Sequence, residues 1–282
     1  MFYILHALGI TYISKTNMNT LLQVAIKAAI EGGKKIMEVY AQDFSVFTKE
    51  DSSPLTEADR QAHESIKALL ADTNLPLLSE EGKLTPFEER KSWEAFWLVD
   101  PLDGTKEFVK RNGEFTVNIA LIKNGTPVLG VVFVPVTGIL YFGEEGNGSY
   151  YLELGNVNTT LSPEEIITQA KALPSTQSVE VYTVVASRSH NTPETEEFID
   201  EKRKKHGEVN MISAGSSLKL CLVAEGKAQV YPRLAPTMEW DTAAGHAVAK
   251  FAGCQVYDFK SNTELQYNKE NLLNPWFVVE RA

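Results

Sequence analysis

The first half of this chain contains two patterns of hydrophobic residues, one typical of helices and one typical of strands. Apolar side chains recur every three or four residues over 20–40 and again over 56–70, which predicts two amphipathic helices lying side by side. Short apolar runs bounded by Gly and Pro predict five strands, and we expect them to form a sheet under the helices. These runs cover 76–78, 96–99, 116–123, 128–134 and 138–143.

The second half alternates strands with helices, which predicts an α/β arrangement. The expected strands are 181–186 and 229–231, and the expected helices are 192–205, 217–225 and 242–251. A boundary near 154–161 would then divide the chain into an N-terminal α+β subdomain, 18–157, and a C-terminal α/β subdomain, 158–282.

Residues 1–17 are apolar in places but do not have the pattern of a signal peptide. No basic segment precedes the apolar part, no small-residue cleavage site follows it, and the run is too short to span a bilayer. Met18 directly precedes the first predicted helix. We therefore interpret 1–17 as an N-terminal extension or a wrongly assigned start.

Composition narrows the function. With 282 residues, 43% of them hydrophobic, the chain is long enough for two subdomains around a large core. A net charge of -10 without a Lys/Arg block argues against nucleic-acid binding. Cys221 and Cys254 have no metal-binding spacing, so we expect two buried thiols in a reducing compartment.

The run WLVDPLDGT carries two carboxylates three residues apart at the end of a strand. Pro101 cannot donate to a sheet ladder, so the strand is predicted to end at about Asp100. Asp103 follows, and the Leu102 carbonyl between the two acids is a further oxygen ligand for a divalent cation. In isolation the same pattern is ordinary turn chemistry.

The turn continues into a predicted helix. Gly104 allows a close approach of the backbone, and Thr105 is expected to be the N-cap of a helix beginning near Lys106. Free amides at such a helix start would attract an anion, so metal and phosphate could meet here.

Two distant acids could join this turn. Glu80 follows a short apolar run, and Asp241 is expected to open a helix after a bend at 238–240. Three or four carboxylates and one carbonyl could support two or three magnesium ions. On composition alone, either acid could equally be a surface residue or a helix cap.

Three blocks of the sequence resemble the signature blocks of the inositol monophosphatase superfamily of lithium-sensitive, magnesium-dependent phosphatases. They are EEG at 80–82, WLVDPLDGT at 97–105 and EWDTAAG at 239–245, in the family's order. Longer runs resemble its 3'(2'),5'-bisphosphate nucleotidases: DPLDGTKEFVKRNGEFTVN at 100–118, SRSH at 187–190, GSSLK at 215–219 and VYPR at 230–233. The resemblance covers the chain from residue 18 onward and implies an α/β fold, an alternating αβαβα sandwich.

The resemblance also implies a catalytic site with two or three Mg²⁺ ions. The implied ligands are Glu80, Asp100, the Leu102 carbonyl, Asp103 and Asp241. Asp100 would bridge two ions, and Glu81 would support a further ion or the surrounding shell. Thr105 and the upstream Asp51 would together accept the proton of the attacking water.

Substrate identity rests on the second half of the chain. The positions implied to line the substrate pocket are Glu80, Leu102, Asp103, Gly104, Thr105, His190, Ser216, Lys219, Arg233 and Asp241. Lys219 and Arg233 would meet a 5'-phosphate that inositol phosphates lack, although a helical lysine in isolation is most often solvated. The implied reaction converts adenosine 3',5'-bisphosphate to AMP and phosphate, with 3'-phosphoadenylyl sulfate as a second substrate, in sulfur assimilation.

Two other functions stay open from the sequence. One is an inositol or fructose phosphatase with the same metal core, and the other is a non-catalytic nucleotide sensor on a phosphatase scaffold. In each case the expected partner is a small molecule, with no nucleic acid and no stable protein partner. We expect a cytoplasmic monomer or homodimer, free or peripheral at the inner face of the membrane.

Overall fold

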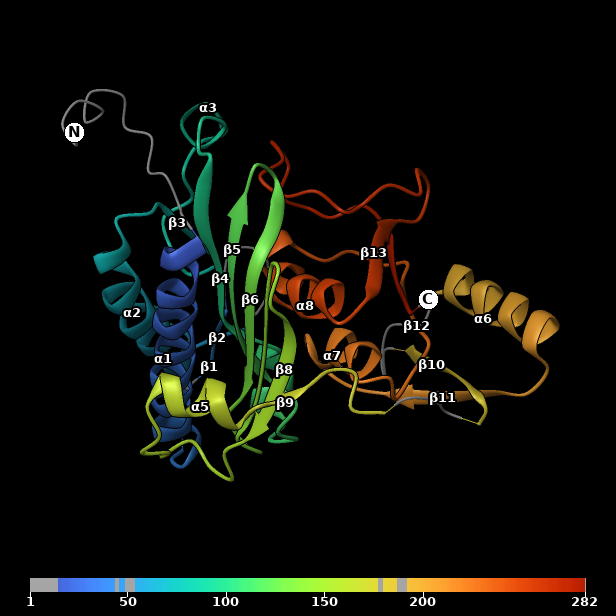
Figure 1. Ribbon diagram of the computed structural model, residues 1–282, viewed down its shortest axis with the longest axis horizontal. Helices are drawn as coiled ribbons and strands as arrows, with labels where there is room; N and C mark the ends of the chain where they lie inside the picture. The colour runs from blue at the N-terminus through green and yellow to red at the C-terminus, as the bar shows by residue number, and fades with distance from the viewer. Residues whose placement is uncertain (1–14, 44–45, 49–53, 177–179, 187–191, 282) are drawn as a thin grey trace.

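The computed structural model describes residues 15–43, 46–48, 54–176, 180–186 and 192–281. Its first layer is the predicted helix pair, α1 (Lys15–Tyr40) and α2 (Glu57–Leu70), which pack side by side (Figure 1). Residues 15–17 of the expected extension belong to α1, whereas 1–14 lie outside the described residues. Thr56 caps α2, because its side chain accepts a hydrogen bond from the Ala58 amide.

The second layer is a seven-stranded sheet in the order β3-β4-β5-β6-β7-β8-β9. Only the β3–β4 pair is parallel in this part of the chain. The strands are β3 (Leu77–Ser79), β4 (Ala95–Asp103), β5 (Thr116–Lys123), β6 (Thr126–Val134), β7 (Ile139–Glu144), β8 (Gly148–Glu153) and β9 (Lys171–Ala172). All five predicted strands are present, and β8 and β9 extend the sheet beyond them.

The middle layer holds α7 (Leu218–Ala224) and α8 (Glu239–Phe251), which lie between the two sheets (Figure 1). α8 is rich in Ala and Gly and is buried almost all round, as expected of a helix covered on both faces. It lies very close to β6, because a Cβ added at Gly130 would come within 2.4 Å of the Ala244 carbonyl oxygen. This close contact fixes where the first turn of α8 lies over the sheet.

The fourth layer is a five-stranded sheet in the order β11-β10-β12-β14-β13, and α6 (Pro193–His206) forms the fifth layer (Figure 1). The strands are β10 (Tyr182–Ala186), β11 (Val209–Ser213), β12 (Val230–Arg233), β13 (Cys254–Asp258) and β14 (Phe277–Arg281). The predicted αβαβα sandwich is therefore confirmed. The sequence predicted β10 and β12 but not the other three strands of this sheet.

The remaining elements are short: β1 (Val46–Thr48), β2 (Pro54–Thr56), a 3-10 turn η1 (Ala71–Thr73), α3 (Phe87–Arg90), α4 (Thr105–Val109) and α5 (Pro163–Gln169). Cys221 and Cys254 are buried free thiols, as predicted. Among the described residues, no helix is both long and apolar enough to cross a membrane.

Candidate active site

The two acids of the WLVDPLDGT run lie on one strand with a bulge between them. β4 does not end at Asp100 as predicted but continues to Asp103. Asp100 pairs with Asn118 and Asp103 with Thr116, so the register shifts by one residue between the two acids. Pro101 lies within this irregularity, where its missing N–H costs no ladder hydrogen bond. The bulge re-aims Asp103, and Asp100 Oδ1 accepts the Leu102 amide at 3.0 Å.

The turn after β4 also differs from the prediction. α4 begins at Thr105, and its N-cap is Gly104, which has a φ of 91° and needs no side chain for that role. The Thr105 hydroxyl is therefore free of capping. It donates to Asp59 Oδ1 at 3.3 Å and lies 3.5 Å from the Leu102 carbonyl oxygen.

Asp59 is a candidate residue that the sequence reasoning missed. It stands at the third position of α2 and is 1% exposed, and its Oδ2 accepts the Thr56 amide at 2.7 Å and the Thr56 hydroxyl at 2.6 Å. The only signal in the sequence is a capping box, TEAD, which reads as helix-start chemistry. The predicted catalytic acid Asp51 lies outside the described residues, as does His190.

Four acids, two on β4, one on α8 and Glu80 in the loop after β3, affect one another electrostatically. Burial raises the pKa of Asp100 well above its ordinary value, and the charges of Glu80, Asp103 and Asp241 raise it further. Burial also raises the pKa of Asp241, and the charge of Asp103 adds to the effect. For Asp103, burial raises the pKa, while the Lys219 charge and a hydrogen bond from Asn118 oppose the shift. These acids therefore form one cluster of closely spaced negative charges.

The chemistry of this donor set fits a hard divalent cation, because its members are carboxylate and carbonyl oxygens whose mutual repulsion a cation would relieve. The described part of the chain nevertheless contains no group of three or more acidic, His or Cys side chains arranged to hold a metal ion. Asp100, Asp103 and Asp241 each have an oxygen that accepts a hydrogen bond from a nearby donor. Asp241, for example, is the third residue of α8 rather than its opening residue, and its Oδ2 accepts the Met238 amide at 2.8 Å.

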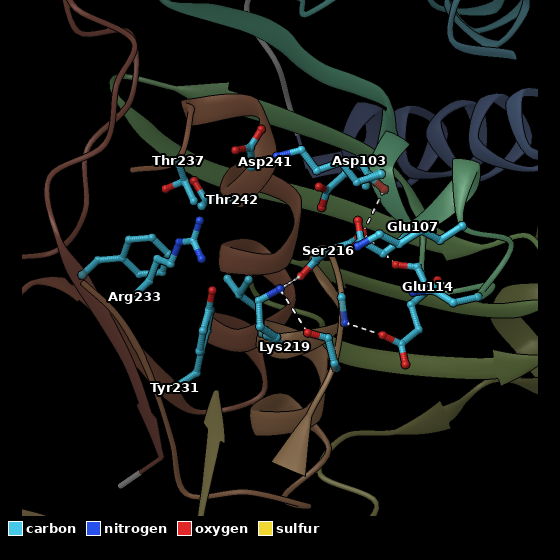
Figure 2. Close-up of a pocket in the computed structure, with 18 residues that line it drawn as sticks. Asp103, Glu107, Glu114, Ser216, Lys219, Tyr231, Arg233, Thr237, Asp241 and Thr242 are labelled. Carbon is cyan, nitrogen blue, oxygen red and sulfur yellow. Dashed lines mark hydrogen bonds between the residues drawn. The ribbon is translucent and has the colours of Figure 1, made fainter. Parts of the chain in front are cut away.

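Asp103 and Asp241 open onto a cavity of about 630 Å³. Figure 2 shows both acids at one end of it, with Lys219, Tyr231 and Arg233 along another wall. The cavity joins the strand and turn that carry Asp103 to the first turn of α8. It thus brings together predicted site residues from both halves of the sequence.

Two cations of this cavity, Lys219 and Arg233, have backbone partners. Lys219 is 8% exposed, and its Nζ donates to the Ser216 carbonyl at 2.7 Å and to the Ala214 carbonyl at 3.4 Å. Burial lowers the pKa of Lys219 to about 8, against the opposing charge of Asp103. Arg233 Nη2 donates to the Pro236 carbonyl at 2.8 Å, while its Nε is buried without a hydrogen-bond partner.

Ser216 holds the wall of the cavity against the acidic turn. Its hydroxyl lies 2.9 Å from the Asp103 carbonyl oxygen and 2.7 Å from that of Glu114, and its own φ is positive, at 48°. A Cβ added at Gly104 would come within 2.2 Å of the same hydroxyl. Glycine is therefore required at 104 by this contact as well as by its backbone conformation.

Residues 17–279 match the inositol monophosphatase family over most of the chain. The chain belongs to that family. It is 44% identical over 265 residues to the 3'(2'),5'-bisphosphate nucleotidase CysQ of Salmonella typhimurium, covering 92% of this chain and 99% of the relative. The CysQ of Escherichia coli K12 has the same identity and coverage.

Solved structures agree with this membership. The CysQ of Bacteroides thetaiotaomicron, a bacterial member of the inositol monophosphatase family, superposes with a TM-score of 0.88 and 52% identity, covering 95% of this chain and 99% of that one. An inositol monophosphatase of Thermotoga maritima shares the fold at 22% identity, with a TM-score of 0.71 and coverage of 93% and 92%. Inositol monophosphatases are typically metal-dependent, which agrees with the oxygen-rich acidic end of the cavity.

Proposed function

We propose that this enzyme hydrolyses the 3'-phosphate of adenosine 3',5'-bisphosphate to give AMP and phosphate. The observation that carries the proposal is a single cavity with crowded carboxylates at one end and two partly or fully buried cations, Lys219 and Arg233, on another wall. Its volume of about 630 Å³ suits a nucleotide-sized ligand. Relatives named as bisphosphate nucleotidases over almost the whole chain support the same substrate class.

The acidic end would hold two or three Mg²⁺ ions through Glu80, Asp100, the Leu102 carbonyl, Asp103 and Asp241. When bound, such ions neutralise phosphate charge and lower the pKa of water toward neutrality. The carboxylates lie close together in a buried place with few positive groups nearby, so their negative charge attracts a metal ion. Raised pKa values at Asp100 and Asp241 express that cost.

Thr105 and Asp59 would handle the proton of the attacking water. Thr105 donates to Asp59, so its hydroxyl oxygen keeps lone pairs that can accept a hydrogen bond from water. Asp59 is fixed by two hydrogen bonds from Thr56, which hold the acceptor in place. The role of Asp51 stays a prediction.

Lys219 and Arg233 would bind the 5'-phosphate. Their hydrogen bonds go to main-chain carbonyl groups, so their positive charges remain available to an anionic ligand. The buried Arg233 Nε lacks a hydrogen-bond partner, and a phosphate oxygen would supply one. A substrate with a single phosphate would leave both cations unmatched.

Phosphate release from three substrates tests the proposal. We expect magnesium-dependent release from adenosine 3',5'-bisphosphate, with much lower kcat/KM on inositol 1-phosphate and fructose 1,6-bisphosphate. A preference for either sugar phosphate would replace the proposed substrate. Binding of the nucleotide without phosphate release, with magnesium present, would instead identify a sensor.

A further inference from the structure

A chain of buried polar side chains joins Asp103 on β4 to Asp241 on α8. Asn118 Nδ2 donates to Asp103 Oδ2 at 3.3 Å and to the Ser217 hydroxyl oxygen at 2.9 Å. The Ser217 hydroxyl in turn donates to the main-chain carbonyl of Asp241 at 2.5 Å. Asn118 is fully buried and Ser217 is 1% exposed, so water does not compete with these contacts. We call Asn118 and Ser217 the amide–hydroxyl bridge.

The bridge has one consistent set of hydrogen bonds. Asn118 uses both amide hydrogens, and its Oδ1 accepts from the Thr116 hydroxyl at 3.0 Å. The Asp103 carboxylate selects this amide orientation over the flipped one, because an ionised carboxylate can only accept. Ser217 both accepts and donates. It stands at the N-cap position of α7 but makes no side-chain capping hydrogen bond, so its hydroxyl serves the bridge instead.

The charges of the two acids explain why the side chains of the amide–hydroxyl bridge are uncharged. Asp103 and Asp241 come from different layers, and the charge of Asp103 raises the pKa of Asp241. A Lys or Arg between them would hold them together but would occupy the place of a cation. The Asn118 amide contacts the Asp103 carboxylate and the Ser217 hydroxyl contacts the Asp241 main chain, so the bridge fixes the positions of both residues without neutralising either acid.

We propose that Asn118 and Ser217 are positioning residues that keep Asp103 and Asp241 at the spacing a shared divalent cation requires. The inference rests on the proposed function, because that function places a cation between these two acids. It adds to that function a reason why β5 and the start of α7 matter for metal affinity although neither supplies a ligand.

Magnesium binding without substrate tests the bridge directly. The melting temperature is measured against magnesium concentration, beginning in EDTA, for the wild type, Asn118→Leu and Ser217→Ala. Both variants should raise the magnesium concentration for half-maximal stabilisation by about ten- to a hundredfold, the usual effect of removing a partner of a metal ligand. Ser217→Thr keeps the hydroxyl and should stay within about threefold of the wild type.

Two further variants separate positioning from general stability. Ser149→Ala is the matched control, because Ser149 is 2% exposed and its hydroxyl donates to the Val248 carbonyl at the other end of α8. It should lower the melting temperature in EDTA without shifting the magnesium midpoint. In the double variant Asn118→Leu/Ser217→Ala, the magnesium midpoint should shift little more than in the worse single variant. The two residues belong to one hydrogen-bonded network, so their effects are not additive.

The possible results are distinct. If Asn118→Leu and Ser217→Ala melt earlier in EDTA but keep the wild-type magnesium midpoint, as Ser149→Ala should, the bridge is only structural and the inference is overturned. If the wild type itself is not stabilised by magnesium, the metal part of the proposed function fails and the inference fails with it. A shifted midpoint restored by Ser217→Thr supports positioning.

Discussion

The two ends of the cavity have opposite charge but are built in the same way. At the acidic end, Asp100 and Asp241 accept hydrogen bonds from backbone amides. At the basic end, Lys219 and Arg233 donate to backbone carbonyls. These four charged groups are thus held by neutral partners, which do not cancel their charges. The arrangement is complementary to a ligand that brings cations to one end and a phosphate to the other.

The difference between the ends lies in what each would do to the reaction. The acidic end has carboxylates close enough to shift one another's pKa, and we propose that metal binding and bond cleavage take place there. The basic end lies within the second half of the chain, and we expect it to select the substrate. Variants at the two ends should therefore give different kinetic signatures.

The largest effect is expected from Asp103→Asn. The substitution keeps the shape and an oxygen that can accept from Asn118, but it removes a charge that we assign to metal binding. Metal ions supply several kcal/mol of transition-state stabilisation, so kcat/KM should fall by about a thousandfold at saturating magnesium. Phosphate release measures this fall. Melting in EDTA should be unchanged or higher, since one repulsive charge is gone, and near-normal turnover would refute the metal assignment.

A smaller loss is expected from Thr105→Val, which removes the hydroxyl that contacts Asp59 but keeps the shape. Proton transfer by a positioned group contributes about 10² to 10⁴ in rate, so kcat should fall by at least about a hundredfold while KM changes less than about threefold. Stopped-time phosphate assays give both constants. Thr105→Ser should recover most of the rate, and failure of that rescue would point to packing instead of proton handling.

At the basic end we expect a change in specificity instead of a general loss. Lys219→Met replaces a buried cation by an apolar chain of similar length. A charged hydrogen bond contributes about 1.5 to 3 kcal/mol, so kcat/KM for adenosine 3',5'-bisphosphate should fall by about ten- to a hundredfold. Adenosine 3'-monophosphate provides the comparison and should be affected less than about threefold. Equal losses on both substrates would mean that Lys219 serves the acidic end through Asp103.

The sequence predicted the presence of most helices and strands better than it predicted the residues at which they begin and end. The pattern of apolar residues located β5 without error and placed α1, α2 and α6 to within a few residues. It missed β8, although that strand forms a local hairpin with β7, and it missed strands whose pairing is long-range. β13 and β14 pair with each other across a long intervening loop, so no local turn signal announces them. Pro101 misled the prediction for β4, because a bulge accommodates it.

The candidate site shows the same limit. The resemblance led to Asp103, Lys219, Arg233 and Asp241, and the structure places all four around one cavity. Asp59 was missed because its carboxylate also completes the capping box of α2. In the sequence, that role alone is enough to explain an Asp at this position. Only the contact from Thr105, forty-six positions along the chain, shows the second role.

A smaller contrast exists within α8, between its first turn at the cavity and the buried His246 further along the helix. Its first turn faces the cavity, whereas His246 is 0% exposed, with Nδ1 3.0 Å from the Tyr267 hydroxyl and Nε2 3.4 Å from Glu264 Oε1. Burial lowers the pKa of His246 below its ordinary value of 6.5. Stability from the neutral ring is therefore fully present above pH 6.5 and is lost as the pH falls toward the folded-state pKa.

Urea unfolding in EDTA between pH 7.5 and 5 should show this loss, at about 1.4 kcal/mol per pH unit or less, the limit for one proton. His246→Gln should flatten part of the slope. His63, whose pKa burial also lowers, contributes in the same direction, so His63→Gln should remove a further part. Equal slopes in wild type and His246→Gln would show that the folded protein protonates His246 as readily as the unfolded chain does. Because the His246 ring contacts Tyr267 and Glu264 and none of the proposed metal ligands, the magnesium midpoint should stay unchanged in His246→Gln, which separates this pH effect from the chemistry of the acidic end.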